Sequence, residues 1–155
     1  MNAPATASAA ASGAVAVAAG ASVAVAAPAH VGAAVRLFGP YQCSADYQND
    51  TGHPVLAKSC YATGPAVRLL GHMEALPGVQ ADVSLSLQDV ATGETAAGPY
   101  TCPGLMFTDF APNQDCGPFD LSAPHGHRYR VVLSWQYTGR ALLPGGTTYG
   151  PEFAW

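Results

Sequence analysis

Hydrophobic and polar residues alternate along most of the chain after residue 35. Segments 67–75 and 82–88 place apolar side chains at every second position, and segment 127–137 does so with tyrosine, valine, leucine and tryptophan. An alternation of period two predicts a β-strand with one buried face. We therefore expect these three segments to be strands, with Tyr129 and Trp135 on the buried face of the longest one.

Five further segments alternate more weakly and are separated by turns that contain many of the 17 Gly and 13 Pro residues. Residues 89–94 fit a hairpin turn in which Gly93 takes a positive φ. No segment of useful length follows the 3.6-residue period of a helix. The pattern predicts an all-β fold, an antiparallel β-sandwich of about 7–8 short strands. The additional expected strands are 35–46, 55–62, 94–102, 119–121 and 147–153.

The four cysteines, Cys43, Cys60, Cys102 and Cys116, predict two disulfides. An even number of cysteines in a short chain is typical of a secreted protein held together by disulfides. Three pairings are possible, and we favour Cys43–Cys60 with Cys102–Cys116 because each then closes a short local loop. Structural zinc sites use cysteine pairs two to four residues apart. This sequence has no such pair, so we expect disulfides rather than zinc.

The first 29 residues differ from the rest, because all 16 Lys, Arg, Asp and Glu residues lie at Arg36 or later. Residues 14–27 form a weakly apolar run, shorter than the about 20 residues that a membrane-spanning helix needs. A run of this length is typical of a secretory signal, with a cut after Ala29 or Ala33. No Lys or Arg precedes it, so an Ala-rich disordered tail is the other interpretation. We expect residues 30–155 to form one domain.

Composition narrows the class of protein further. Only 10% of the residues are charged and the formal net charge is −4, whereas soluble domains average about 25% charged residues. The low proportion of charged residues excludes a disordered acidic tail, which needs more charge. The net negative charge argues against a nucleic-acid-binding protein, which needs a basic surface. The abundance of Ala, Gly and Pro is typical of GC-rich bacteria such as actinomycetes.

The segment 121–131 (LSAPHGHRYRV) carries a resemblance to a known fold. It resembles the segment that leads into the penultimate strand of immunoglobulin-like and fibronectin type III-like domains, where a tyrosine forms the tyrosine corner. The resemblance implies an immunoglobulin-like sandwich in which the Tyr129 hydroxyl bonds the backbone a few residues upstream. The cysteine of antibody domains is absent from this strand. Many unrelated functions share this fold.

Histidines are the candidate metal ligands. His125 and His127 form a His-x-His pair, and His72 lies two residues before Glu74 on a polar strand face. Cleavage after residue 29 would make His30 the N-terminal residue, whose amine and imidazole could together bind copper with a second histidine. This arrangement resembles the histidine brace of secreted β-sandwich copper proteins, including lytic polysaccharide monooxygenases. The candidate ligands are His30, His53, His72, His125 and His127.

Catalytic motifs are missing from the sequence. It lacks the Gly-x-Ser-x-Gly elbow, a Gly-rich phosphate loop and the spacing of an EF-hand. Aromatic residues in or near turns could instead stack on sugar rings or anchor a protein, although core packing accounts for most aromatics. These residues are Tyr41, Tyr47, Tyr61, Tyr100, Phe107, Phe110, Phe119, Tyr149, Phe153 and Trp155.

We therefore expect a secreted binding module that is not an enzyme and has no cofactor. Its expected partner is a protein or a carbohydrate at the cell surface, not nucleic acid. We expect a monomer whose mature chain does not span a membrane. Two alternatives stay open: a copper-binding or copper-oxidative protein that uses His30, and a structural surface component without a specific ligand.

Overall fold

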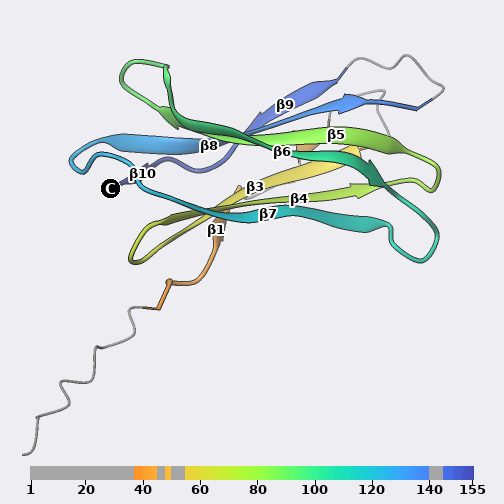
Figure 1. Cartoon of the computed structure of the whole chain (residues 1–155), viewed down its shortest axis with the longest axis horizontal. Coiled ribbons are helices and arrows are strands. Elements are labelled where there is room, and N and C mark those ends of the chain that lie inside the picture. The colour runs from red at the N-terminus through yellow and green to blue at the C-terminus, as the bar shows by residue number, and fades with distance from the viewer. Residues whose placement is uncertain (1–36, 45–47, 50–54, 140–144) are drawn as a thin grey trace, which may run out of the picture. The chain divides into compact units, whose positions relative to one another are not determined.

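The structure, a computed structural model, describes residues 37–44, 48–49, 55–139 and 145–155. These residues form two antiparallel sheets that stack into a sandwich (Figure 1). The expected all-β fold is confirmed. In this part of the chain no helix is long and apolar enough to cross a membrane. The expected signal segment 1–29 lies outside the described residues, as does the start of the domain at His30.

The first sheet, called sheet A, contains β1 (Gln42–Cys43), β2 (Gln48–Asn49), β3 (Val55–Thr63), β4 (Val67–Ala75) and β7 (Asn113–Leu121). Its strand order is β1-β3-β4-β7. Strand β2 also pairs with β3. Because the other side of β3 pairs with β4, β1 and β2 form one interrupted edge.

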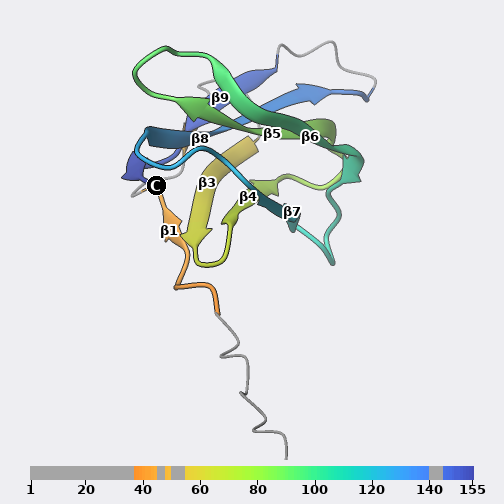
Figure 2. The same cartoon turned by 60° about the vertical axis from the view of Figure 1, so that its left-hand side comes forward.

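The second sheet, called sheet B, contains β5 (Gln80–Asp89), β6 (Thr95–Met106), β8 (Arg128–Tyr137), β9 (Gly146–Tyr149) and β10 (Phe153–Ala154). Its order is β10-β8-β5-β6, and β9 also pairs with β8. The turned view shows sheet B lying over sheet A (Figure 2). Strands β9 and β10 share one edge of sheet B, as β1 and β2 share one edge of sheet A.

The inner faces of both sheets form one hydrophobic core. Buried and partly exposed residues alternate along β4, β5 and β8. Leu69 and Met73 of sheet A are fully buried, as are Leu85 and Leu133 of sheet B. Trp135 is 4% exposed, as its place in the alternation predicts. Each fully buried side chain of this size contributes about 1.5–3 kcal/mol, so the period-two pattern supplies the driving force for stacking the sheets.

Several strand boundaries differ from the sequence-based expectation. Strand β6 ends at Met106 rather than at 102. Strand β7 begins at Asn113 rather than at 119; the prediction was too short because Gly117 and Pro118 interrupt the alternation of this segment. The expected single strand 147–153 is wrong, since it is divided at Gly150-Pro151 into β9 and β10. Of the expected strand 35–46, only Gln42–Cys43 is a strand among the described residues.

Both disulfides form with the favoured pairing. Cys43 and Cys60 lie opposite each other on β1 and β3 of sheet A. Cys102 and Cys116 join β6 to β7. Because β6 is an edge of sheet B and β7 an edge of sheet A, the second disulfide links the two sheets, which their spacing in the sequence did not indicate.

Antiparallel pairing places the connections at two ends of the sandwich (Figure 1). The tyrosine-corner end, on the left, contains the connections around residues 63–67, 89–95 and 121–128. The Phe110 end, on the right, contains those around residues 75–80 and 106–113. The two ends differ in how their loops are held, as described below.

Replacing Cys102 and Cys116 together with alanine should lower the free energy of unfolding by about 3 kcal/mol, the chain-entropy value for a loop of about 15 residues. The measurement is urea denaturation, with circular dichroism as the signal of unfolding. The matched control replaces Cys43 and Cys60, which close a loop of similar length within one sheet and should cost a similar amount. An unchanged unfolding midpoint for the first variant would contradict the expectation.

Candidate functional site

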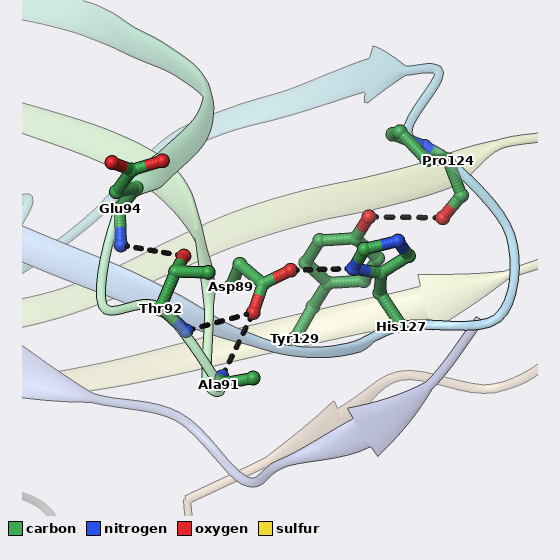
Figure 3. Close-up of polar contacts among 7 residues, drawn as sticks. All are labelled: Asp89, Ala91, Thr92, Glu94, Pro124, His127 and Tyr129. Carbon is green, nitrogen blue, oxygen red and sulfur yellow. Dashed lines mark hydrogen bonds and ion pairs between the residues drawn. The ribbon is translucent and has the colours of Figure 1, made fainter.

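A hydrogen-bonded pair, Asp89 and His127, joins two connections at the tyrosine-corner end (Figure 3). Asp89 is the last residue of β5, and His127 directly precedes β8. The Nδ1 atom of His127 lies 2.7 Å from a carboxylate oxygen of Asp89. Asp89 is 8% exposed, whereas the His127 side chain is 50% exposed. The pair therefore combines a buried carboxylate with an imidazole that reaches solvent.

The other carboxylate oxygen of Asp89 organises the β5–β6 turn. It accepts hydrogen bonds from the backbone N–H of Ala91 at 2.8 Å and of Thr92 at 3.2 Å. The Thr92 hydroxyl accepts another from the N–H of Glu94. Aspartate often closes turns in this way, and Gly93 takes the expected positive φ of 74°. The carboxylate thus fixes the turn while it holds His127.

These donors keep Asp89 ionised. The hydrogen bond from His127 lowers the pKa of Asp89, and so do the hydrogen bonds from Ala91 and Thr92. Burial acts in the opposite direction, and the pKa of Asp89 lies below its usual value. Hydrogen bonds to the charged form of a carboxylate favour that form. The negative charge also acts on Tyr129, because burial and the nearby Asp89 carboxylate raise the pKa of its phenol.

Tyr129 makes the contact that the resemblance to the tyrosine corner implies. Its hydroxyl donates to the backbone carbonyl of Pro124, five residues upstream, at 2.9 Å (Figure 3). Its ring is 1% exposed and lies near those of His127 and Phe153. The hydrogen bond ties the β7–β8 crossover to the core.

The same crossover is held by the segment after β10. The Trp155 indole donates to the carbonyl of Ala123 at 3.0 Å, and the Trp155 N–H donates to that of His127. The ring of His125 stacks on Trp155 with centroids 4.8 Å apart. Trp155 packs partly buried against the core, so it closes this end of the sandwich.

The chemistry available to the Asp89–His127 pair is limited. A carboxylate at Nδ1 fixes the orientation of an imidazole and leaves Nε2 to accept a proton or bind a ligand. Among the described residues, no hydroxyl or thiol hydrogen-bonds to His127, so the pair lacks the nucleophile that a triad would require. Its clearest effect is to join the turn after β5 to the crossover before β8.

The candidate metal ligands that the structure describes do not form a metal site. His72 lies on the outer face of sheet A, with Nδ1 2.6 Å from a carboxylate oxygen of Asp115. His125 and His127 make separate contacts at the tyrosine-corner end. Within the described residues, no three His, Cys, Asp or Glu side chains are grouped as a metal site requires. His30 and His53 lie outside those residues.

Most of the aromatic residues pack in or against the core, and three of those described are exposed. Phe107 and Phe153 are buried, while Tyr61, Tyr100, Phe119 and Trp155 pack against the core. Tyr47 lies outside the described residues. The exposed residues are Tyr41 at 40%, Tyr149 at 49% and Phe110 at 99%.

Phe110 occupies the tip of a tight turn at the Phe110 end. The backbone groups of Thr108 and Ala111 hydrogen-bond to each other in both directions, at 3.2 and 3.1 Å, and the Thr108 hydroxyl accepts from the N–H of Ala111. The preceding residue, Phe107, is fully buried. The turn thus has an ordered base while its phenylalanine points away from the core.

Two further apolar residues lie at this end. Leu76 is 66% exposed and Met106 is 56% exposed. Leu76 lies in the β4–β5 connection, and Met106 is the last residue of β6. The β4–β5 and β6–β7 connections are joined by backbone hydrogen bonds, from the N–H of Gly78 to the carbonyl of Phe107 and from the N–H of Phe107 to that of Val79. The Phe110 end therefore presents apolar side chains on a backbone that is held together by hydrogen bonds.

From the sequence, Phe110 is one of several turn aromatics and nothing distinguishes it from the others. Asp89 is predicted only as a turn residue, because its partner His127 is 38 positions away. An aspartate at the end of a strand and a histidine at the start of another carry no signal of contact until the pairing of β5 with β8 is known.

Comparisons of the chain with known protein families, curated proteins and solved structures find no match.

Replacing Tyr129 with phenylalanine should lower the free energy of unfolding by about 1–2 kcal/mol, because the ring stays and only a buried hydrogen bond is lost. Urea denaturation measures the change. The control is Tyr149→Phe, which removes an exposed hydroxyl and should change stability by less than about 0.5 kcal/mol. Equal effects of the two substitutions would show that the Pro124 contact contributes nothing.

Stability should fall in acid partly through Asp89. Its pKa is lowered in the folded state, so its contribution is fully present above the unfolded pKa of about 3.9 and is lost as pH falls through the folded value. Asp89→Asn keeps a turn acceptor but loses the charge. We expect it to destabilise the protein at pH 7 and to converge on the wild type in acid.

The measurement is the free energy of unfolding of the wild type and Asp89→Asn across this pH range. The control is Asp109→Asn, because the Asp109 carboxylate accepts no hydrogen bond from a described residue. A stability difference between Asp89→Asn and the wild type that stayed constant with pH would contradict the assignment.

Proposed function

We propose that this protein is an extracellular, non-catalytic binding module with an immunoglobulin-like topology, and that it binds a protein partner through the Phe110 end. The observation that carries the proposal is Phe110, which is 99% exposed at the tip of a turn with an ordered base. The strand order supports the topology, the disulfides support the extracellular location, and the exposed apolar side chains support the binding role.

Strand order supports the topology. Strand β4 pairs with β7 and β5 pairs with β8, while the β4–β5 and β7–β8 connections each pass from one sheet to the other. In the strand letters used for immunoglobulin domains, β4 corresponds to B, β7 to E, β5 to C and β8 to F. Strand β3 then corresponds to A, β6 to C′, and β9 with β10 to G. The resulting order, A-B-E and G-F-C-C′, resembles that of immunoglobulin domains, whose corner tyrosine also lies near the start of strand F.

The disulfides support an extracellular location. All four cysteines are paired, and such bonds persist in oxidising compartments but are rare in the cytosol. The weakly apolar run before the domain is consistent with export. A bacterial origin is inferred only from composition.

Exposed apolar side chains support a binding role for the Phe110 end. A phenylalanine left in water forgoes about 1.5–3 kcal/mol that burial would supply. Phe110, Leu76 and Met106 together are the kind of residues that anchor protein interfaces, where a few buried apolar side chains carry most of the affinity.

A protein partner suits this end better than a sugar. A sugar that stacks on an aromatic ring also hydrogen-bonds to nearby polar side chains, but the other large exposed side chains described at this end, Leu76 and Met106, are apolar. Apolar neighbours are more effective in the dry centre of a protein interface. We therefore propose an apolar pocket on a protein as the complement of Phe110.

The test selects binders from a phage-displayed library of random peptides on the immobilised full chain and measures their affinity for variants by biolayer interferometry. Phe110→Ser should weaken the affinity of the selected peptides for the protein by at least about tenfold, because burial of the ring contributes at least about 1.4 kcal/mol. The control is Tyr149→Ser, an exposed aromatic on sheet B, which should leave these affinities unchanged.

Peptides that bind Phe110→Ser as tightly as the wild type would refute the proposed surface. A second arm measures sedimentation with phosphatidylcholine vesicles. Phe110-dependent binding to vesicles, without Phe110-dependent binding of peptides, would assign this end to membranes and overturn the protein partner.

A further inference from the structure

The outer face of sheet B contains a depression of about 640 Å³ that the proposed function does not use. It lies across all four neighbouring strands β6, β5, β8 and β9, with lining residues contributed by each. The strands form its base, so the position of its side chains is set by sheet register rather than by loops.

Four hydroxyl residues form one row across this depression. Ser84 of β5 pairs with Thr101 of β6 on one side and with Ser134 of β8 on the other. Ser134 in turn pairs with Thr147 of β9. Since neighbouring strands lie about 4.8 Å apart, the row extends about 14 Å. All four residues line the depression.

The hydroxyls retain capacity to bind a ligand. Ser134 and Thr147 hydrogen-bond to each other at 3.0 Å, which uses one donor and leaves acceptor sites on both. The hydroxyls of Ser84 and Thr101 have no hydrogen-bond partner among the described residues. A row of donors and acceptors at regular spacing suits a ligand that itself carries hydroxyls at regular spacing.

An amide and a carboxylate extend the row. Asp82 and Gln136 are opposed on β5 and β8, one step along the strands from the hydroxyls, and both line the depression. One oxygen of Asp82 accepts from the N–H of Gly104 at 2.7 Å, which orients the carboxylate. A carboxylate accepts well from sugar hydroxyls, and an amide both donates and accepts.

Charge limits the class of ligand. Asp82 is the only charged residue among the described residues that line the depression. The basic residue on the same face of β8, Arg130, is engaged by Gln88 and by the ring of Tyr149. Of the described lining residues, an anionic ligand would meet a carboxylate and no cation, whereas a neutral polyol would meet hydrogen-bonding groups.

We infer that the outer face of sheet B is a binding site for a neutral oligosaccharide, which lies along the Thr101–Ser84–Ser134–Thr147 row. The row supplies hydrogen bonds to successive sugar rings, and Asp82 and Gln136 bind the hydroxyls on one side. This site is separate from the Phe110 end, so either one can fail without the other.

The test uses the full chain and an array of neutral oligosaccharides of glucose, mannose, galactose and N-acetylglucosamine, with polygalacturonate as the anionic comparison. The best neutral ligand is then titrated by calorimetry. A triple variant with Ser84→Ala, Thr101→Val and Ser134→Ala should bind this ligand at least about tenfold more weakly. This change corresponds to the loss of one or two hydrogen bonds.

The matched control is Ser86→Ala, because Ser86 lies on the same face of β5, two residues from Ser84, and does not line the depression. It should leave the affinity unchanged. In ¹H–¹⁵N spectra the ligand should shift the backbone amide signals of Ser84 and Ser134 and leave the indole signal of Trp155 in place.

Three results would overturn the inference. The first is that no neutral oligosaccharide on the array binds. The second is that the triple variant binds as tightly as the wild type while its spectrum shows it to be folded. The third is that polygalacturonate binds as tightly as the neutral ligands, which would contradict the argument from charge.

Discussion

The interlocking of two strand pairs is the constraint on which the rest of this structure depends. Strands β4 and β5 are consecutive but lie in different sheets, as do β7 and β8, and each member of one pair hydrogen-bonds to a member of the other. Neither sheet can complete its hydrogen bonds unless the second is built at the same time. The β7–β8 crossover must therefore hold its shape, and Tyr129, His127 and Trp155 all bond or pack at that crossover.

The sequence predicted those parts of the fold that depend on local pattern. The alternation in 82–88 and 127–137 identifies β5 and β8 because every second side chain enters the core. The tyrosine corner was also visible, since Pro124 and Tyr129 are five residues apart. Strand β7 was predicted too short, because Gly117 and Pro118 disturb the alternation of this segment.

The polar arrangements could not be predicted, because they depend on register between distant strands. Asp89 meets His127 only after β5 pairs with β8. The hydroxyl row depends on three pairings at once, and each of its members alone is an ordinary exposed Ser or Thr. The link between the sheets made by Cys102 and Cys116 likewise followed from topology, although the pairing itself followed from spacing.

The contrast between the two ends of the sandwich has a consequence for how this chain can change. Side-chain hydrogen bonds hold the tyrosine-corner end, so a substitution there alters the framework as well as the surface. At the Phe110 end, backbone hydrogen bonds join the loops, and the side chains of Leu76 and Phe110 are largely exposed. New side chains can replace them without refolding the sandwich. The domain is thus a scaffold whose surface at this end can diverge, or be engineered, with little effect on stability.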